Sequence, residues 1–213
     1  MVPALAIFDC DGVLVDSEPI ANRVLARHLS DAGLPTTYDE SITTYLGLTL
    51  KAVLEKAEAL HGKRLPADFT DTLQEETFAA FERDLTPVSG VTEALGALSC
   101  PSCVASSGAH DKMRVTLGIT GLYARFEGRI FSATEVTRGK PFPDLFLHAA
   151  TRMGTNPEGC VVIEDSPFGV QAAVAAGMRV LGYVGGATAQ PLAPHGAVEF
   201  TDMRELPSLL SSV

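Results

Sequence analysis

Three short apolar runs in this 213-residue chain are each followed at once by polar side chains that could do chemistry. Runs of this kind, at 5–8, 103–105 and 161–163, are typical of buried parallel strands. Ligands bind beyond the carboxyl ends of parallel strands, so we expect the polar side chains to meet in one solvated crevice. They are Asp9 and Asp11 after the first run, Ser106 and Ser107 after the second, and Glu164 and Asp165 after the third.

Carboxylates brought together in this way require a cation. Two ionised carboxylates roughly 5 Å apart repel each other by about 3 kcal/mol at an effective dielectric constant of about 20. A set of oxygen ligands without His or Cys selects a hard ion, Mg²⁺ before Zn²⁺. Mg²⁺ is usually shared with a substrate phosphate. The acidic cluster therefore predicts phosphoryl chemistry.

Other residues offer what a phosphoryl group needs. The Ser106 hydroxyl can donate to its oxygens, and the backbone N–H groups of Ser107 and Gly108 are predicted to open a helix, which favours anions. Lys140 adds a positive charge on a loop stiffened by two prolines. A carboxylate nucleophile, a second carboxylate to exchange the proton, one metal ion and one lysine suffice for covalent phosphoryl transfer.

Alternating strands and helices must position these residues. Further apolar runs at 128–131, 180–183 and 198–200 predict strands, and helical patterns occupy 91–98, 112–117, 144–153 and 170–176, with a short helix from Arg204. This alternation predicts an α/β fold, a doubly wound parallel sheet with helices on both faces. From about Glu18 to Asp84 no clear strand run appears, and helical periodicities occupy 20–29, 50–60 and 73–81 instead. We therefore expect an α/β core of residues 1–16 and 85–213 with an inserted all-helical module of residues 17–84.

Composition excludes several classes of protein. The net charge of −10 has the wrong sign for a protein that neutralises nucleic-acid phosphates. No apolar run approaches the roughly 20 residues of a membrane-spanning helix. The four cysteines are too few and too scattered for a disulfide scaffold. We expect a cytoplasmic protein, a monomer or weak homodimer, that binds neither nucleic acid nor membrane.

Four motifs together resemble those of the haloacid dehalogenase (HAD) superfamily. Residues 8–18, Phe-Asp-Cys-Asp-Gly-Val-Leu-Val-Asp-Ser-Glu, resemble the first motif, and Ser106 stands where the second has its Ser or Thr. Lys140 matches the lysine of the third motif, and the acidic pair at 164–165 matches the fourth. The resemblance implies a Rossmann-like core. The helical insertion resembles the cap of the subgroup with phosphoglycolate phosphatase and β-phosphoglucomutase.

The resemblance also implies roles for single residues. Asp9 would be the nucleophile that becomes phosphoaspartate, and Asp11 the general acid and then the base. Mg²⁺ would bind the Asp9 carboxylate, the Asp11 backbone carbonyl and Asp165, with Glu164 bound directly or through water. Ser106 and Lys140 would hold the phosphoryl oxygens. The phosphate-binding residues expected in all are Gly12, Ser106, Ser107, Gly108 and Lys140.

The same comparison favours a phosphatase. Dehalogenases of the superfamily lack an acid at the position of Asp11. β-Phosphoglucomutases carry a His and an Arg in the cap where this chain has Ala21 and Leu50, although Lys51 lies one place along. Residues 104–113 are loosely similar to phosphatases of hexose or gluconate phosphates. We expect a Mg²⁺-dependent phosphatase of a small phosphorylated metabolite, with a sugar-phosphate mutase as the alternative.

Overall fold

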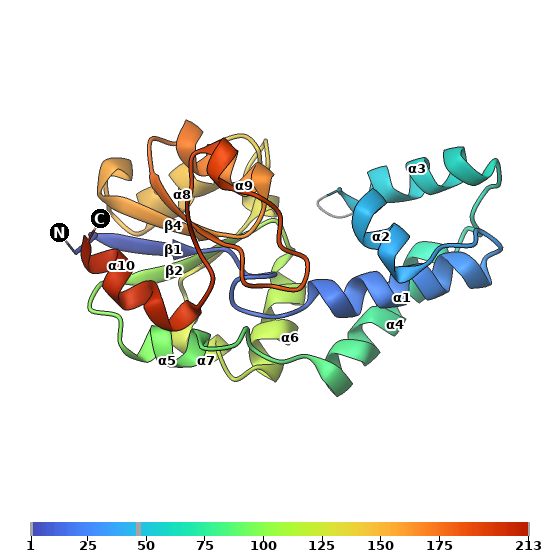
Figure 1. The fold of residues 1–213 in the computed structure, drawn as a ribbon, viewed down its shortest axis with the longest axis horizontal. Coiled ribbons are helices and arrows are strands. Elements are labelled where there is room, and N and C mark those ends of the chain that lie inside the picture. The colour runs from blue at the N-terminus through green and yellow to red at the C-terminus, as the bar shows by residue number, and fades with distance from the viewer. Residues whose placement is uncertain (1, 46–47, 213) are drawn as a thin grey trace. The chain divides into compact units, whose positions relative to one another are not determined.

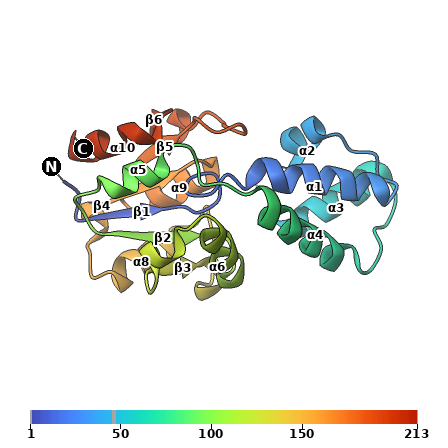
Figure 2. The same ribbon diagram turned by 90° about the horizontal axis from the view of Figure 1, so that it is seen from below.

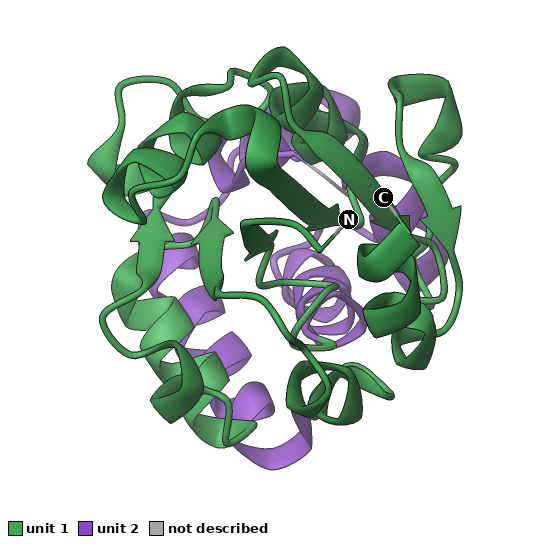
Figure 3. Cartoon of the chain, turned by 90° about the vertical axis from the view of Figure 1, so that its left-hand side faces the viewer, with its two compact units in different colours: residues 1–16, 86–213 green, residues 17–85 purple. Residues whose placement is uncertain are grey.

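The chain folds into two compact units, coloured green and purple in Figure 3. The computed structural model describes residues 2–45 and 48–212. The first unit comprises Met1–Asp16 and Thr86–Val213, and the second comprises Ser17–Leu85. The second unit is thus an insertion into the first.

A six-stranded sheet forms the centre of the first unit. Its order is β3-β2-β1-β4-β5-β6, and every neighbouring pair is parallel (Figure 2). The strands are β1 (Leu5–Phe8), β2 (Ser102–Ser106), β3 (Ile130–Ser132), β4 (Cys160–Glu164), β5 (Arg179–Tyr183) and β6 (Val198–Phe200). Since the chain starts in the middle of the sheet and builds outward in both directions, β1 lies between β2 and β4. The predicted α/β class is confirmed.

Helices cover both faces of this sheet, α8 and α9 on one face and α5, α6, α7 and α10 on the other (Figure 1). Their bounds are α5 (Val91–Gly96), α6 (His110–Ile119), α7 (Tyr123–Phe126), α8 (Asp144–Arg152), α9 (Pro167–Ala175) and α10 (Leu206–Ser212). The face toward α8 and α9 buries Ile7 with its partners Cys103 and Val162 against Phe146. This core holds the carboxyl ends of the three central strands in fixed register.

The described residues of the second unit, 17–45 and 48–85, form four helices, α1 (Glu18–Asp31), α2 (Tyr38–Tyr45), α3 (Leu50–His61) and α4 (Phe69–Asp84). Leu29 of α1 and Phe81 of α4 are almost completely buried within it. The periodicity of the sequence did not indicate α2, because this helix turns polar Ser41 inward, where its hydroxyl donates to Asn22 Oδ1 at 2.8 Å. None of the helices in 2–45 and 48–212 has both the length and the apolar content of a membrane span.

The chain leaves and re-enters the first unit at adjacent points. Asp16 N–H donates to the Thr86 carbonyl at 3.0 Å, and Val88 N–H donates to the Leu14 carbonyl at 3.0 Å. Between these two hydrogen bonds, Val15 forms an antiparallel bridge with Pro87. The two crossing segments are therefore tied together inside the first unit.

Candidate active site

The carboxyl ends of β1, β2 and β4 bring the predicted residues together. Asp9 directly follows β1, and its N–H donates to the Ile163 carbonyl at 2.9 Å, which continues the pairing with β4. Ser106 is the last residue of β2, and Glu164 is the last of β4. One carboxylate oxygen from each of Asp9, Glu164 and Asp165 lies within 4.8 Å of the others. Acidic residues more than 150 positions apart thus share one site.

Lys140 lies at the centre of this cluster. Its Nζ donates to Asp9 Oδ1 at 2.6 Å and to Glu164 Oε1 at 2.5 Å. The side chains of Lys140, Asp9 and Glu164 are 6%, 9% and 0% exposed. The sequence led us to expect Asp9 in a solvated crevice, but the core encloses it. A buried lysine between two buried carboxylates compensates charges that neither partner could carry alone.

Burial and neighbouring charge act in opposite directions on these groups. Removal from water raises the pKa of the Asp9 carboxyl to about 7; the Lys140 ammonium works against this rise, whereas the Glu164 charge adds to it. Burial alone would lower the pKa of Lys140, but the two carboxylates outweigh it and raise that pKa above its usual value. Lys140 therefore stays protonated and keeps a positive charge against Asp9.

Glu164 is the anchor of Lys140. Besides accepting from Lys140, its carboxylate accepts three further hydrogen bonds at Oε2, each 2.9 Å long, from the N–H of Asp165, the N–H of Ser166 and the Ser166 hydroxyl. A Cβ on Gly169 would lie 1.7 Å from Glu164 Oε1, so only glycine fits there. Four donors thus bind the carboxylate that was expected to be a metal ligand, directly or through water.

Two glycines expected to bind phosphate make hydrogen bonds within the protein. The Gly12 N–H donates to the Val15 carbonyl at 2.9 Å. Its φ is +75°, and a Cβ there would lie 1.9 Å from Asp165 Oδ2, so this glycine instead makes room for the Asp165 carboxylate. The Gly108 N–H donates to Ser106 Oγ at 3.1 Å.

The expected helix start at Ser107 and Gly108 is wrong. Helix α6 begins at His110 with Ala109 as its N-cap, because Ser106 Oγ takes the Gly108 N–H in a tight turn before the helix. The Gly108 carbonyl accepts from the Ser132 hydroxyl at 2.7 Å, which ties this loop to the end of β3. Ser106 is buried and Ser107 is exposed.

No motif or periodicity indicated a site role for Lys112, which lies on the first turn of α6. Its Nζ donates to Asp11 Oδ2 at 2.8 Å.

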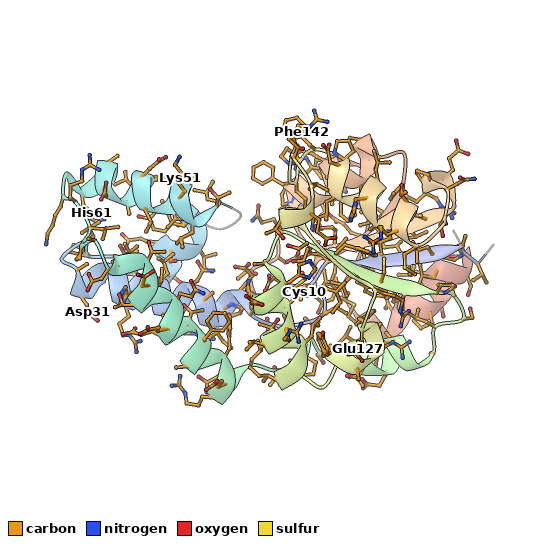
Figure 4. All side chains as sticks on the ribbon, turned by 180° about the vertical axis from the view of Figure 1, so that it is seen from behind. Cys10, Asp31, Lys51, His61, Glu127 and Phe142 are labelled. Atoms are coloured by element: carbon orange, nitrogen blue, oxygen red, sulfur yellow. The ribbon has the colours of Figure 1, made fainter. Side chains whose placement is uncertain are left out.

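Cys10, between the two aspartates, is fully buried just past the end of β1 (Figure 4), and burial raises the pKa of its thiol well above its usual value.

A parallel sheet with acidic strand ends and a buried lysine between them defines a Rossmann-like hydrolase core. The sequence profile of the haloacid dehalogenase-like hydrolases matches residues 6–183. The chain belongs to the haloacid dehalogenase-like hydrolase family, which confirms the resemblance seen in the sequence.

Individual relatives agree with this assignment. The chain is 30% identical over 203 residues to 6-phosphogluconate phosphatase of Escherichia coli, covering 95% of this chain and 92% of that one. A crystal structure of a conserved haloacid dehalogenase-like protein from Agrobacterium tumefaciens is 37% identical, with a TM-score of 0.89 over 98% of both chains. A family hydrolase from Deinococcus radiodurans, solved with bound phosphate and sodium, is 33% identical, with a TM-score of 0.84 over 100% of this chain and 97% of that one. Family and relatives class the chain as a phosphoric monoester hydrolase.

Proposed function

We propose that the protein hydrolyses a small phosphomonoester through a phosphoaspartate on Asp9. The observation that carries this proposal is the buried Asp9–Lys140–Glu164 ion cluster at the carboxyl ends of adjacent parallel strands. A fixed ammonium beside a carboxylate favours its ionised form and offers charge to phosphoryl oxygens. The similarity to a phosphatase along nearly the whole chain supports the same chemistry.

The two half-reactions follow from the positions of Asp9 and Asp11. In the first, an Asp9 carboxylate oxygen forms a bond to phosphorus, the ester P–O bond breaks, and Asp11 gives its proton to the departing alkoxide. In the second, Asp11 takes a proton from water, the water oxygen bonds to phosphorus, and the Asp9–phosphorus bond breaks. Inorganic phosphate leaves, and both carboxyl groups return to their starting states. Lys140 and the Ser106 hydroxyl hold the phosphoryl oxygens.

Asp9 and Asp165, whose carboxylate oxygens lie within 4.8 Å of each other, would hold a Mg²⁺ ion, and the family resemblance adds the backbone carbonyl of Asp11. All three donors are oxygen atoms, the set that a hard dication prefers. Asp165 also borders a pocket formed with Gly12, Asp16 and Tyr183, where solvent can reach it. Glu164 would bind the ion through water, because its carboxylate already accepts four hydrogen bonds. The ion would supply charge that screens the phosphoryl group from the attacking carboxylate.

The first test is the release of phosphate from a panel of esters. We expect hydrolysis of sugar and sugar-acid phosphates in the presence of Mg²⁺ and its loss in excess EDTA, with recovery when Mg²⁺ is restored. The panel includes 6-phosphogluconate, hexose phosphates, phosphoglycolate and nucleotides. A hexose 1-phosphate given with a bisphosphate primer tests the mutase alternative, whose product would be the 6-phosphate isomer. Metal-independent release, or release from none of these esters, would contradict the proposal.

We further propose that the inserted unit is the family's cap and determines the choice of substrate. Every catalytic group assigned above belongs to the other unit. The hydrogen bond between Asp16 and Thr86 allows a short Gly-Ser linker to replace Ser17–Leu85. We expect the shortened protein to keep slow turnover of 4-nitrophenyl phosphate and to lose most of its discrimination between sugar phosphates. Unchanged ratios of kcat/KM among the sugar phosphates would refute this role.

A further inference from the structure

Lys112 forms an ion pair with the second catalytic carboxylate. The distance from its Nζ to Asp11 Oδ2 is 2.8 Å, and the two side chains are 35% and 16% exposed. This differs from the other ion pair at the site, because Lys140 is almost fully buried and lies between two carboxylates. Each of the two catalytic aspartates therefore has its own lysine, one inside the core and one near its surface.

The Lys112 side chain lies beside the loop of residues 106–108. A Cβ built on Gly108 would lie 3.6 Å from Lys112 Cδ, 3.5 Å from Ser106 Oγ and 3.8 Å from Asp11 Oδ2. The lysine stem, the serine hydroxyl and the aspartate carboxylate thus surround one small volume. Lys112 belongs to the site by position, although 101 residues separate it from Asp11.

The start of α6 is held in place, which fixes the base of this side chain. The Ser132 hydroxyl donates to the Gly108 carbonyl at 2.7 Å, and the His110 ring lies 2.9 Å from Glu135 Oε1. Glu135 also accepts from the Ser132 N–H at 2.7 Å. These contacts join the first turn of α6 to the end of β3 on both sides of the loop.

An acid that protonates a leaving group must lie at hydrogen-bond distance from one particular oxygen. The carboxyl of Asp11 can rotate about two side-chain torsions, and an ammonium at one of its oxygens restricts that rotation. We propose that Lys112 is a positioning residue that orients Asp11 toward the leaving-group oxygen. This inference rests on the proposed function of Asp11 and adds a group that the four sequence motifs do not contain.

The test compares leaving groups in Lys112→Met and the wild-type protein. We expect kcat/KM for alkyl phosphates to fall about 10- to 100-fold, because a misplaced Asp11 cannot protonate an alkoxide leaving group efficiently. For 4-nitrophenyl phosphate, whose leaving group needs little protonation, we expect a loss of about threefold or less. Lys112→Arg keeps the charge and should restore much of the alkyl activity. Arg114→Met, on the same helix, removes a charge that lies over the Tyr123 ring and should resemble the wild type.

Other outcomes would overturn the inference. Equal losses with alkyl and aryl phosphates would mean that Lys112 supports the fold or binds phosphate in general. A rise in KM for anionic sugar phosphates at constant kcat would make it a substrate contact. If Lys112→Met does not fold by circular dichroism, Lys112→Gln is measured by the same ratio. Wild-type protein that hydrolyses no phosphate ester would refute the proposed function itself, whereas an active wild type with an unchanged ratio in the variants refutes only the role of Lys112.

Discussion

Asp9→Asn is expected to lower phosphate release by a factor of about 10⁴ or more, with both alkyl and aryl phosphates, because loss of a covalent nucleophile removes the whole reaction path. The substitution replaces one oxygen of the buried carboxylate by an NH2 group and preserves the shape of the side chain. We therefore expect a folded protein with an unchanged circular dichroism spectrum. The measurement is steady-state kcat and KM with 4-nitrophenyl phosphate and a sugar phosphate.

Asp11→Asn supplies the complementary result. It leaves Asp9 able to attack an aryl phosphate but removes the base that the second half-reaction needs. Phosphoryl-enzyme should then accumulate, and peptide mass spectrometry should place the phosphoryl group on Asp9. Asp111→Asn, which alters an exposed aspartate of α6, is the matched control and should keep wild-type rates. A phosphoryl group on any other residue, or activity above about one hundredth in Asp9→Asn, would exclude Asp9 as the nucleophile.

The sequence was sufficient to predict the central sheet and the convergence of its acidic ends. Apolar runs before Asp9 and Glu164 mark buried strands, and parallel strands present their carboxyl ends at one edge. The register of β1 with β4 places Phe8 opposite Ile163. The residues that follow them, Asp9 and Glu164, therefore lie side by side at the edge of the sheet. The positions of these acidic residues can therefore be predicted from the sequence, because each directly follows a strand and parallel strands end at the same edge of the sheet.

The different surroundings of Glu164 and Asp165 could not be predicted in this way. The two acids are adjacent in sequence and chemically alike. What separates them is space, because Gly169 leaves room for the first carboxylate and Gly12 leaves room for the second. Both effects depend on backbone approaching from another segment.

The first residue of α6 and the contact made by the long Lys112 side chain could not be predicted from the hydrophobic periodicity either. The serine turn at 106–108 delays α6 to His110, since a side chain has taken the N–H that a helix cap would use. Lys112 is a single lysine without a motif, and nothing in its neighbours shows that it reaches Asp11. Periodicity reports which face of an element is buried, and it carries no information about a flexible charged side chain.

Lys140→Met is expected to remove activity and to destabilise the fold as well. The change leaves Asp9 and Glu164 buried without their shared cation, and breaking such a pair typically costs about 3–5 kcal/mol. Turnover should fall at least about 100-fold, because a charge aimed at the phosphoryl group is lost. Without the ammonium, the pKa of Asp9 is raised further, which protonates the nucleophile near neutral pH. Urea unfolding at pH 7 in EDTA measures the free energy of unfolding without metal binding.

A second substitution separates the two effects. In the double variant Lys140→Met with Glu164→Gln, the amide oxygen at residue 164 can still accept from Asp165 and Ser166. The amide NH2 group takes the place of the carboxylate oxygen that faced Lys140, so no unpaired charge is left at residue 164. We expect this double variant to regain part of the lost free energy of unfolding and none of the turnover, since no cation stands beside Asp9. Equal stability of Lys140→Met and the wild type would show that the buried ion cluster does not contribute to folding. Recovery of turnover in the double variant would show that Lys140 serves only to compensate Glu164, and the phosphoryl group would then have to be held by other residues.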